Sequence, residues 1–574
     1  AWFWWPGAAP AAPVNAARLT PAPPSALPDP AQPGAYAVRT LFYGSGADRH
    51  RPEWGTAVDL LTTPVNGRAF LSGWTDLRTR YWGFDETALP RNGRVWYPEG
   101  AGPFPLVLIV HGNHDMTDFS DGGYAYLGEL LASRGYVVVS VDQNFLNGSA
   151  VADWLGERRL RGENDARAWL LLEHLRLWRD WQQTAGNPFY QKVDLTRVAL
   201  IGHSRGGEAV AVAAAFNRLD RYPDNARIPF SYDFGIRAVV AIAPVDGQYR
   251  PAGAPTPLHN VSYLVLHGAH DMDVTSFVGQ QQFNRATFDA ADPGFKASVY
   301  VYGANHGQFN SSWGRADRLP PVSHFYNTAQ LLPLAAQQGI AQAFISAFLE
   351  TAVAETADYR PLFQDARAGG AWLPDTVYLT RYADGRVRPV ATFDEDVDVT
   401  TTTAPGGRLL GRYLRTWREA RLPQKGTDLE SRAVALGWAA GGSSPATYAV
   451  TLPDGWQTAA GGALLFALAD AEPDDGDEPI DLSVELRDVA GETAVLPLSH
   501  VMPLQPQPVA ALRKPLPWDD APASEPVLQS YALPLADFTA VNPALDVTRL
   551  AAVTFRFDRG GPGEVWLDDL GFRP

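Results

Sequence analysis

The 574-residue sequence contains no cysteine, and none of its apolar runs approaches the length of a membrane-spanning helix. The lack of cysteine excludes disulfides, thiolate metal sites and catalysis by a thiol. A helix needs about 20 consecutive apolar residues to cross a bilayer. We therefore expect no transmembrane helix in this sequence.

Positive charge is scarce as well. The sequence has 47 Lys and Arg against 63 Asp and Glu, a formal net charge of -16, and no dense Lys/Arg tract. Proteins that bind nucleic acid or anionic membranes usually present clustered basic residues. The composition therefore argues against both kinds of partner.

The length of the chain predicts more than one domain, and the composition of its N-terminus predicts a separate segment. A chain of this length is too long to fold around a single hydrophobic core. Its content of 46% hydrophobic residues excludes global disorder. Residues 1–35 are rich in Pro and Ala without a helical or strand period, which predicts a tether.

Because Ala1 is not an initiator Met, we expect a processed, secreted protein, extracellular or at the cell surface. Residues 1–5 would be the remnant of a membrane tether.

Continuous apolar runs alternate with helical patterns over residues 36–365. Such runs are typical of strands buried on both faces, as in a parallel sheet. Apolar stripes at helical spacing run from Ala168 to Trp178 and from Ala341 to Phe348. This pattern predicts a doubly wound α/β domain with an N-terminal β extension. The six expected strands of its sheet lie at residues 106–110, 136–141, 198–201, 239–242, 263–266 and 298–302.

The hydrophobic period changes to two in residues 371–574. Apolar and polar residues alternate over 480–486 and 553–557, which is typical of strands with one wet face. Turns between such runs predict an antiparallel β-sandwich. Residues 564–572 resemble the last strand of galactose-binding-like jelly rolls. The resemblance implies either a purely structural appendage, which is the preferred interpretation, or a domain with polysaccharide as a partner. The acidic stretch 470–478 is interpreted as a solvated turn, with calcium binding as the alternative.

A strand, a sharp turn and a helix are predicted around one serine. An apolar run leads into Gly202-His203-Ser204-Arg205-Gly206, and a stretch of small residues at helical spacing follows. This is the G-x-S-x-G pattern of a nucleophile elbow. The serine occupies a strained apex, so the residues two before and two after it must be nearly free of side chains. The pattern predicts Ser204 as an exposed nucleophile.

The serine needs a general base, and the base needs an acid that fixes its tautomer. In folds with this elbow the acid and then the histidine follow the serine, each at the end of a later strand. Asp271 follows the fifth apolar run, and His306 follows the sixth. We predict His306 as the base and Asp271 as the acid, with Asp273 and Asp246 as alternative acids.

Two backbone amides are predicted to stabilise the oxyanion of an acyl-transfer reaction. One belongs to Arg205, directly after the serine, and the other to Asn113, in the loop after residues 106–110. Gly112 permits the tight turn that directs the next amide inward. The Arg205 side chain is interpreted as a buried ion-pair partner, with a substrate carbonyl or carboxylate as the alternative contact.

Two similar His/Asp stretches, residues 111–115 and 267–271, each follow a predicted strand. Clusters of this kind can bind zinc. The elbow and the oxyanion loop already explain why both stretches lie at the carboxyl edge of the sheet. We therefore expect neither a metal nor another cofactor.

At these residues the chain resembles the serine esterases of the α/β-hydrolase superfamily. The elbow is similar to that of chlorophyllases, and residues 244–247 resemble the motif after their sixth strand. The His-Gly loop and the turn before Asp271 resemble those of cutinase-like polyester hydrolases and platelet-activating-factor acetylhydrolases. The resemblance covers about residues 91–350. Glu208 stands where chlorophyllases have Lys, and the cysteines of many secreted relatives are missing.

The resemblance implies the triad Ser204, Asp271 and His306, although the chlorophyllase motif favours Asp246 as the acid. Together with the residues it predicts a carboxylic-ester hydrolase that acts through an acyl-enzyme on bulky or polymeric esters, as polyester hydrolases do. One alternative is an acetyl or feruloyl carbohydrate esterase whose C-terminal domain binds polysaccharide. Another, of a different class, is a non-catalytic binding or adhesion protein. The candidate substrate contacts are His203, Trp313, Phe309 and Phe119.

Overall fold

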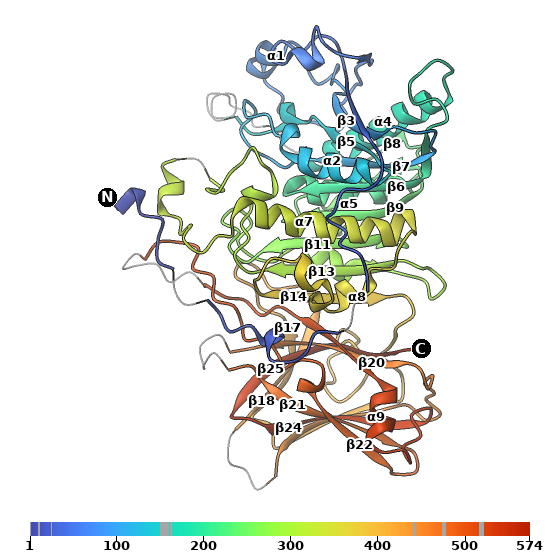
Figure 1. The fold of residues 1–574 in the computed structure, drawn as a ribbon, viewed down its shortest axis with the longest axis vertical. Helices are drawn as coiled ribbons and strands as arrows, with labels where there is room; N and C mark the ends of the chain where they lie inside the picture. Colours follow the sequence, from blue (N-terminus) through green and yellow to red (C-terminus); the bar gives the residue numbers. More distant parts are fainter. Residues whose placement is uncertain are drawn as a thin grey trace.

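A ten-stranded mixed sheet with helices forms the upper part of the structure in Figure 1, and antiparallel sheets form the lower part. We refer to these as the α/β part and the C-terminal part. The computed structural model describes residues 2–9, 12–23, 26–149, 160, 163–318, 320–439, 444–472, 478–515 and 522–574.

The large sheet is parallel at its centre, and antiparallel pairs follow on both sides, with one further parallel pair of β1 and β2 at one end. Its strands are β1 (Val38–Gly44), β2 (Leu60–Leu61), β3 (Gly93–Pro98), β4 (Phe104–Val110), β5 (Val137–Val141), β6 (Val193–His203), β9 (Ile236–Ile242), β11 (Ser262–Gly268), β13 (Phe295–Val301) and β14 (Tyr378–Asp384). Their order is β14-β13-β11-β9-β6-β4-β5-β3-β1-β2. Neighbours from β13 to β5 run parallel, whereas β14 and β3 join this group antiparallel. All six predicted strands lie in this sheet.

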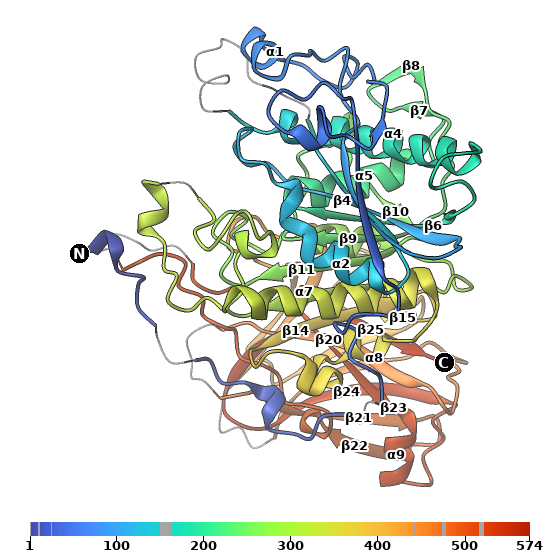
Figure 2. The ribbon, with the colours of Figure 1, turned by 45° about the horizontal axis from the view of Figure 1, so that its top comes forward.

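Helices cover both faces of the large sheet. The α-helices of the described chain are α1 (Asp76–Trp82), α2 (Ala125–Ser133), α4 (Glu163–Gln183), α5 (Arg205–Phe216), α6 (Gln280–Arg285), α7 (Leu334–Leu349), α8 (Arg360–Gln364) and α9 (Leu535–Val541). Helices α4 and α5 share one hydrophobic core with the sheet, and α2 and α7 share another on the opposite face. Figure 2 shows α7 lying across its face of the sheet.

Strand β4 explains why the apolar runs of the sequence are continuous. All of its residues are buried. Leu108 and Val110 belong to the core with α4 and α5, whereas Val107 and Ile109 belong to the core with α2 and α7. A strand that is covered on both faces needs apolar residues at every position.

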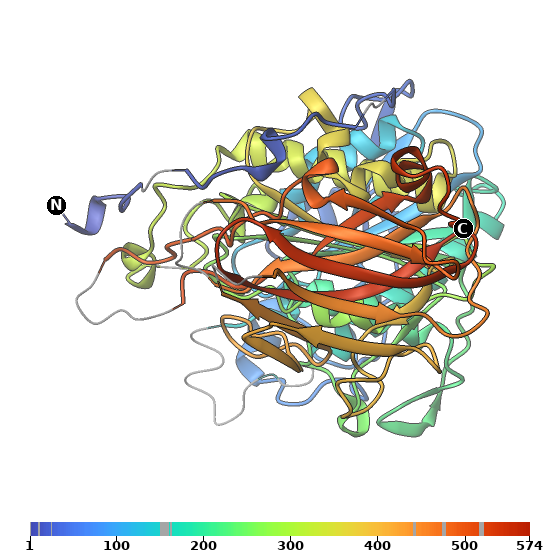
Figure 3. The same ribbon diagram turned by 90° about the horizontal axis from the view of Figure 1, so that it is seen from below.

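The C-terminal part contains two antiparallel sheets with a common core (Figure 3). Its strands are β15 (Arg388–Ala391), β16 (Arg408–Arg412), β17 (Thr416–Arg421), β18 (Arg432–Trp438), β19 (Ala446–Thr451), β20 (Ala463–Asp470), β21 (Asp481–Asp488), β22 (Thr493–Pro497), β23 (Gln529–Pro534), β24 (Leu550–Arg559) and β25 (Gly563–Arg573). One sheet has the order β17-β18-β25-β20-β23, with β15 on β25, and the other β16-β19-β24-β21-β22. Leu436 and Phe466 of the first sheet and Val484 and Phe555 of the second belong to one cluster. The alternating pattern is thus confirmed as antiparallel strands.

Two short ribbons complete the α/β part. Strand β7 (Arg221–Tyr222) pairs antiparallel with β8 (Asn225–Pro229), and β10 (Leu258–His259) pairs parallel with β12 (Ala286–Thr287). Neither ribbon contains a predicted site residue.

The predicted boundary between residues 365 and 371 does not match the sheet topology. Strand β14 lies beyond this boundary, yet it pairs with β13 and completes the large sheet. At its centre, Arg381 is 2% exposed and forms ion pairs with Asp568 (2.9 Å) and Asp569 (2.7 Å) of β25. A charged residue in the middle of a strand breaks the apolar pattern, so the sequence did not reveal β14 as part of this sheet.

Residues 15–16 of the N-terminal segment contact the region where the two parts meet. Figure 1 shows this dark blue segment running past the C-terminal part before it rises to the α/β part. Ala16 is fully buried, and its N–H donates to Gln505 Oε1 (2.8 Å), while the Asn15 side chain donates to the carbonyl of Thr376 (3.1 Å). The segment therefore lies on the protein surface here rather than detached from it.

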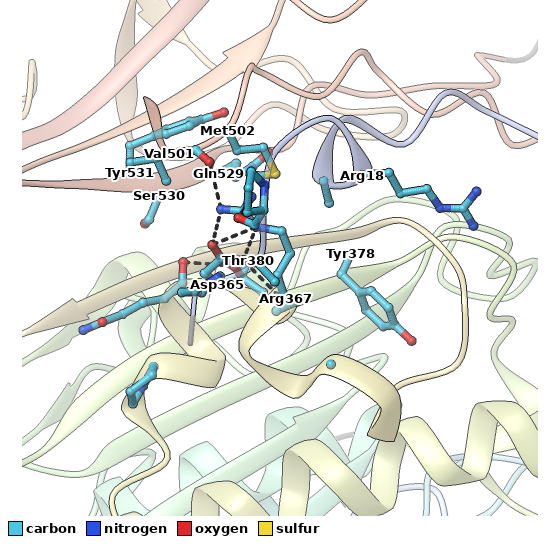
Figure 4. A pocket seen from close by; sticks show the side chains of 18 of the residues that line it. Arg18, Asp365, Arg367, Tyr378, Thr380, Val501, Met502, Gln529, Ser530 and Tyr531 are labelled. Carbon is cyan, nitrogen blue, oxygen red and sulfur yellow. Dashed lines mark hydrogen bonds and ion pairs between the residues drawn. The ribbon is translucent and has the colours of Figure 1, made fainter. Parts of the chain in front are cut away.

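A cavity of about 740 Å³ lies between the N-terminal segment, the α/β part and the C-terminal part (Figure 4). Leu373 and Tyr378 line it from one side, and Val501 and Met502 from the other. Polar and charged side chains of its wall contact one another: Arg18 pairs with Asp375 and Arg367 with Asp365, and His500 Nε2 lies within hydrogen-bond distance of Asp537. None of the predicted site residues lines this cavity, so it is not the candidate site.

Within the described ranges, no helix is both long enough and apolar enough to cross a bilayer. The acidic stretch interpreted as a turn falls partly outside these ranges, because residues 473–477 are not described. The Asp470 carboxylate at its start accepts hydrogen bonds from the backbone N–H groups of Glu472 and Gln507, each at 3.2 Å. Calcium binding there stays an untested alternative.

Replacing Arg381 with methionine is expected to destabilise the contact between the two parts. The buried Asp568 and the half-buried Asp569 would lose their cation, and breaking a buried ion pair costs about 3–5 kcal/mol. Urea denaturation followed by tryptophan fluorescence measures this loss. Arg415→Met is the control, since its pair with Glu472 is 54% and 32% exposed and is worth under about 1 kcal/mol. Equal losses in both variants would contradict the prediction.

Candidate active site

Ser204 lies at the turn between β6 and α5. Its φ of 58° and ψ of -122° are strained for a residue that has a side chain. A Cβ on Gly202 would overlap the carbonyl of Gly206, and a Cβ on Gly206 would lie 2.6 Å from the carbonyl oxygen of Val110. The close passage of strand and helix therefore requires both glycines, as in a nucleophile elbow.

Ser204 and His306 line one cavity of about 750 Å³. Its wall combines the aromatic rings of Trp313 and Tyr326 with charged groups such as Arg318. The volume lies within the range of about 300–1,000 Å³ that is usual for ligand sites. Ser204 is only 3% exposed, so the expectation of an exposed serine is corrected: the residue lines a cavity whose walls shield it.

Asp271 and His306 form a buried acid–base pair. The two residues follow β11 and β13, which are parallel neighbours. His306 Nδ1 donates to Asp271 Oδ2 at 2.7 Å, and both side chains are almost fully buried. Asp271 Oδ1 accepts hydrogen bonds from the backbone N–H groups of Asp273 (2.9 Å) and Val274 (2.7 Å). This arrangement can fix the tautomer in which Nε2 of His306 accepts a proton.

The charge of His306 depends on the carboxylates around it. Burial disfavours the imidazolium and would lower its pKa, but Asp271, Asp273 and Asp317 outweigh burial and raise the pKa to about 9. His306 is therefore mostly protonated at neutral pH in this structure.

His306 Nε2 has no hydrogen-bond partner in the described part of the chain. Asp273 Oδ2 lies 3.5 Å from this nitrogen, and Arg318 pairs with the same carboxylate at 2.5 Å. Asp273 thus faces the proton-accepting nitrogen and not the nitrogen that an orienting acid holds. Hydrogen bonds between a nucleophile and its base often shorten only in the substrate complex. The absence of a partner for Nε2 among the described residues is therefore compatible with His306 acting as the base of Ser204.

The other alternative acid, Asp246, has a different partner. Arg285 pairs with its carboxylate through both terminal nitrogens of the guanidinium. Burial raises the pKa of Asp246, although Arg285 opposes that rise. In this structure Asp271, and not Asp246, contacts His306 Nδ1.

The two residues predicted to supply oxyanion amides line the same cavity as Ser204. Arg205 begins α5, and N–H groups in the first turn of a helix lack intrahelical partners. Its side chain forms an ion pair with Glu163. Asn113 Oδ1 accepts a hydrogen bond from the backbone N–H of Gly148 at 2.6 Å, which fixes the loop. Their role in holding an oxyanion stays a prediction.

Among the four predicted substrate contacts, Trp313 lines the cavity. Its ring lies beside His203, with 4.5 Å between ring centroids, and is nearly parallel to the ring of His306 at 5.9 Å. His203 is fully buried, and its Nδ1 forms a hydrogen bond of 3.1 Å with the Tyr124 hydroxyl. His203 does not line the cavity, so its prediction as a substrate contact is corrected: its buried ring packs against Trp313 and His306 instead.

Phe309 and Phe119 do not line the cavity, and their prediction as substrate contacts is corrected. Phe309 is fully buried in the core under α7. The ring of Phe119 packs against the guanidinium of Arg51 at 4.2 Å. Aromatic character in a loop near the site does not reveal whether a ring faces the core or the cavity.

Asp317 is a site residue that the sequence did not reveal. Its carboxylate accepts hydrogen bonds from the backbone N–H groups of Met272 (3.0 Å), His306 (3.1 Å) and Gly307 (2.7 Å). It therefore joins the loop of the acid to the loop of the base. Burial, together with the nearby Asp271, raises the pKa of Asp317 to about 7. Asp317 belongs to no motif in the sequence that would mark this role.

The His/Asp stretches that follow β4 and β11 do not converge on a metal site. His111 Nδ1 donates to the Gly112 carbonyl (2.8 Å), and its Nε2 accepts from the backbone N–H of Gln143 (3.0 Å). His270 Nδ1 accepts from the backbone N–H of Gly303 (3.1 Å). A search of the described residues gives no group of three or more His, Cys, Asp or Glu arranged to hold a metal ion.

Comparison with known proteins identifies one family. Residues 81–262 match the chlorophyllase family, whose members are α/β-hydrolase-type esterases. No curated protein matches the chain. The matched stretch contains Ser204 and Asp246 and ends before Asp271 and His306. The match confirms the resemblance to a serine esterase and implies an α/β-hydrolase-type fold for the matched residues.

Reaction of Ser204 with a fluorophosphonate is expected to accelerate with pH around a midpoint near 9. A histidine whose pKa is raised to about 9 stays protonated below that pH and then cannot accept the serine proton. Asp273→Asn removes one of the carboxylates that raise this pKa, so the midpoint should move to lower pH. Labelling rates measured from pH 6 to 10 test this.

Asp358→Asn is the matched control for the pH series. Asp358 is 64% exposed and pairs with Arg360, away from the cavity of Ser204. The substitution Asp358→Asn removes the same charge without touching His306, so the pH midpoint of Ser204 labelling should stay unchanged. A midpoint that moves equally in both variants, or upward in Asp273→Asn, contradicts the assignment.

Proposed function

We propose that this protein is a serine carboxylic-ester hydrolase that acts through an acyl-enzyme. The observation that carries the proposal is the 2.7 Å hydrogen bond between His306 Nδ1 and Asp271, beside the cavity into which Ser204 opens. A buried serine at a strained elbow, a histidine oriented by a carboxylate and a common cavity are the parts that acyl transfer requires. The chlorophyllase match over the elbow supports ester hydrolysis.

The proposed reaction proceeds in two stages. His306 Nε2 takes the proton of Ser204 as Oγ attacks the ester carbonyl, and the amides of Asn113 and Arg205 donate to the oxyanion. His306 then gives this proton to the leaving alcohol, which leaves an acyl group on Ser204. In the second stage His306 deprotonates a water molecule that attacks the acyl carbonyl, and the proton returns to Ser204 as the acid leaves.

Bulky or polymeric esters are the proposed substrates. The cavity of about 750 Å³ can accept a large group, and Trp313 and Tyr326 offer flat apolar surfaces to it. Asp115, Asp118 and Arg318 also line the cavity, so its polar wall favours esters with polar groups over long aliphatic chains. Such a substrate is consistent with the proposed extracellular or cell-surface location, which fractionation of the producing cells can test.

For the C-terminal part, we propose a galactose-binding-like jelly-roll sandwich on the basis of its two antiparallel sheets with one core. Polysaccharide binding by this part, and with it a carbohydrate esterase activity, is the second candidate. Retention of the whole chain on insoluble acetylated xylan, with release of acetate, supports this candidate, and no retention argues against it.

Hydrolysis of p-nitrophenyl acetate, butyrate and octanoate tests the proposed function. The wild type should hydrolyse at least one of these esters, with higher kcat/KM for the two shorter ones. Ser204→Ala should lower kcat by about 10⁴-fold or more, because the nucleophile is lost. Release of soluble products from an amorphous polyester film tests the polymeric substrate. An inert wild type, or a variant that keeps its rate, leaves the binding or adhesion protein as the better explanation.

A further inference from the structure

The loop of residues 269–277, which carries Asp271 and is called the acid loop here, contacts the C-terminal part at both of its ends. We propose that the C-terminal part holds this loop in its catalytic position, with Glu525 and Lys425 as positioning residues for Asp271. The inference rests on the proposed function, because it assigns to these residues a role in the same acid–base pair.

Glu525 connects the segments that carry the acid and the base. Its side chain is almost fully buried, being 2% exposed. Oε1 accepts hydrogen bonds from the backbone N–H of Phe277 (3.1 Å) and from the Tyr300 hydroxyl (3.3 Å). Phe277 ends the acid loop, and Tyr300 lies on β13, six residues before His306. One carboxylate of the C-terminal part thereby holds both segments.

Lys425 contacts the other end of the acid loop. It lies in the connection between β17 and β18, and its backbone N–H donates to Glu525 Oε2 at 3.2 Å. Its Nζ donates to the carbonyl of Ala269 at 3.4 Å, two residues before Asp271. Burial lowers the pKa of Lys425, whereas the carboxylates of Glu525 and Asp271 favour its charged form. The ammonium is therefore close enough to influence the catalytic carboxylate.

An aromatic cluster fills the space behind the acid loop. The buried ring of His267 stacks on Phe277, with 5.1 Å between centroids, and lies parallel to Tyr300 at 6.1 Å. Phe277 and Tyr300 are the two residues that Glu525 contacts. The hydrogen bonds of Glu525 thus fix two rings of this cluster, one of which, Phe277, belongs to the acid loop itself.

The acid loop is held from two sides by different parts of the chain. On the side of the cavity, Asp317 of the α/β part accepts the N–H of Met272 at 3.0 Å. On the opposite side, the hydrogen bonds to Ala269 and Phe277 come from the C-terminal part. Removing Glu525 would leave a buried N–H and a buried hydroxyl without this acceptor, which favours movement of the loop.

The same interface offers a matched control. Ser431 lies further along the connection between β17 and β18. Its hydroxyl accepts a hydrogen bond of 2.6 Å from the Asn284 side chain. This hydrogen bond also joins the two parts of the molecule, but it involves α6 and not the acid loop. Ser431→Ala therefore weakens the interface without loosening Asp271.

Kinetics of Glu525→Ala, Glu525→Gln and Ser431→Ala in the full-length chain test the proposal. Residues that orient metal ligands from the second layer typically contribute about 10- to 100-fold, and we take the same range for Glu525. We expect kcat of Glu525→Ala to fall by about that factor with KM nearly unchanged. Glu525→Gln keeps an acceptor for Phe277 and should recover part of the loss. Ser431→Ala should keep kcat within about two-fold at a temperature where every variant is folded.

A proton NMR signal gives a readout that does not require turnover. The Nδ1 proton shared by His306 and Asp271 should resonate far downfield in the wild type and in Ser431→Ala. Glu525→Ala should lose or broaden this signal, and Glu525→Gln should retain it in part. If Glu525→Ala does not fold, Glu525→Gln alone must reduce both the signal and kcat relative to Ser431→Ala.

The outcomes separate the two proposals. If the wild type hydrolyses esters and the Glu525 variants keep kcat within about two-fold, the positioning role is overturned and the esterase proposal stands. Equal losses in Ser431→Ala also overturn it, since they indicate a general effect of the interface. If the wild type hydrolyses no ester, the proposed function fails. The NMR signal then decides the positioning role, and an unchanged signal in the Glu525 variants overturns it.

Discussion

The hydrogen bond between Asp271 and His306 forms only if the loop after β11 and the loop after β13 keep a fixed position relative to each other. Parallel pairing of β11 with β13 aligns Leu266 with Val299, so both loops leave the same edge of the sheet. Strand pairing alone brings the loops into the same region, and local hydrogen bonds then select one arrangement. Asp317 and the turn formed by Asp271 supply those bonds on the side of the cavity. The elbow places Ser204 at the same edge, because β6 belongs to the same parallel group.

The concentration of carboxylates around one imidazole has an electrostatic consequence. Charges interact more strongly in a buried site than in water, and three carboxylates there stabilise the protonated His306. Such stabilisation helps the imidazolium that forms when Ser204 loses its proton, but it also favours a protonated His306 before the attack, and this form cannot accept the serine proton. The ion pair of Asp273 with Arg318 moderates the field at Nε2, because it neutralises the carboxylate that faces this nitrogen.

Most of the large sheet could be predicted from the sequence, since doubly buried strands require continuous apolar residues. The elbow was predictable for a similar reason: Gly202 and Gly206 are required by close backbone passage. Contacts that join distant segments left no local pattern. The role of Asp317 depends on three backbone N–H groups, and β14 was hidden by Arg381, whose charge is neutralised by residues almost 190 positions later. Phe309 and Phe119 were misplaced because composition does not encode the direction of a ring.

The position of β14 also bears on how the chain can be divided. This strand lies after the predicted end of the α/β domain, yet its pairing with β13 covers one edge of the large sheet. A fragment that ends near residue 365 would leave the backbone N–H and C=O groups of β13 open to solvent. Open edges of this kind recruit strands from other molecules. The α/β part therefore depends on residues after 365 to keep β13 paired, and a fragment that ends after residue 384 would keep this pairing, with β14 as the edge strand.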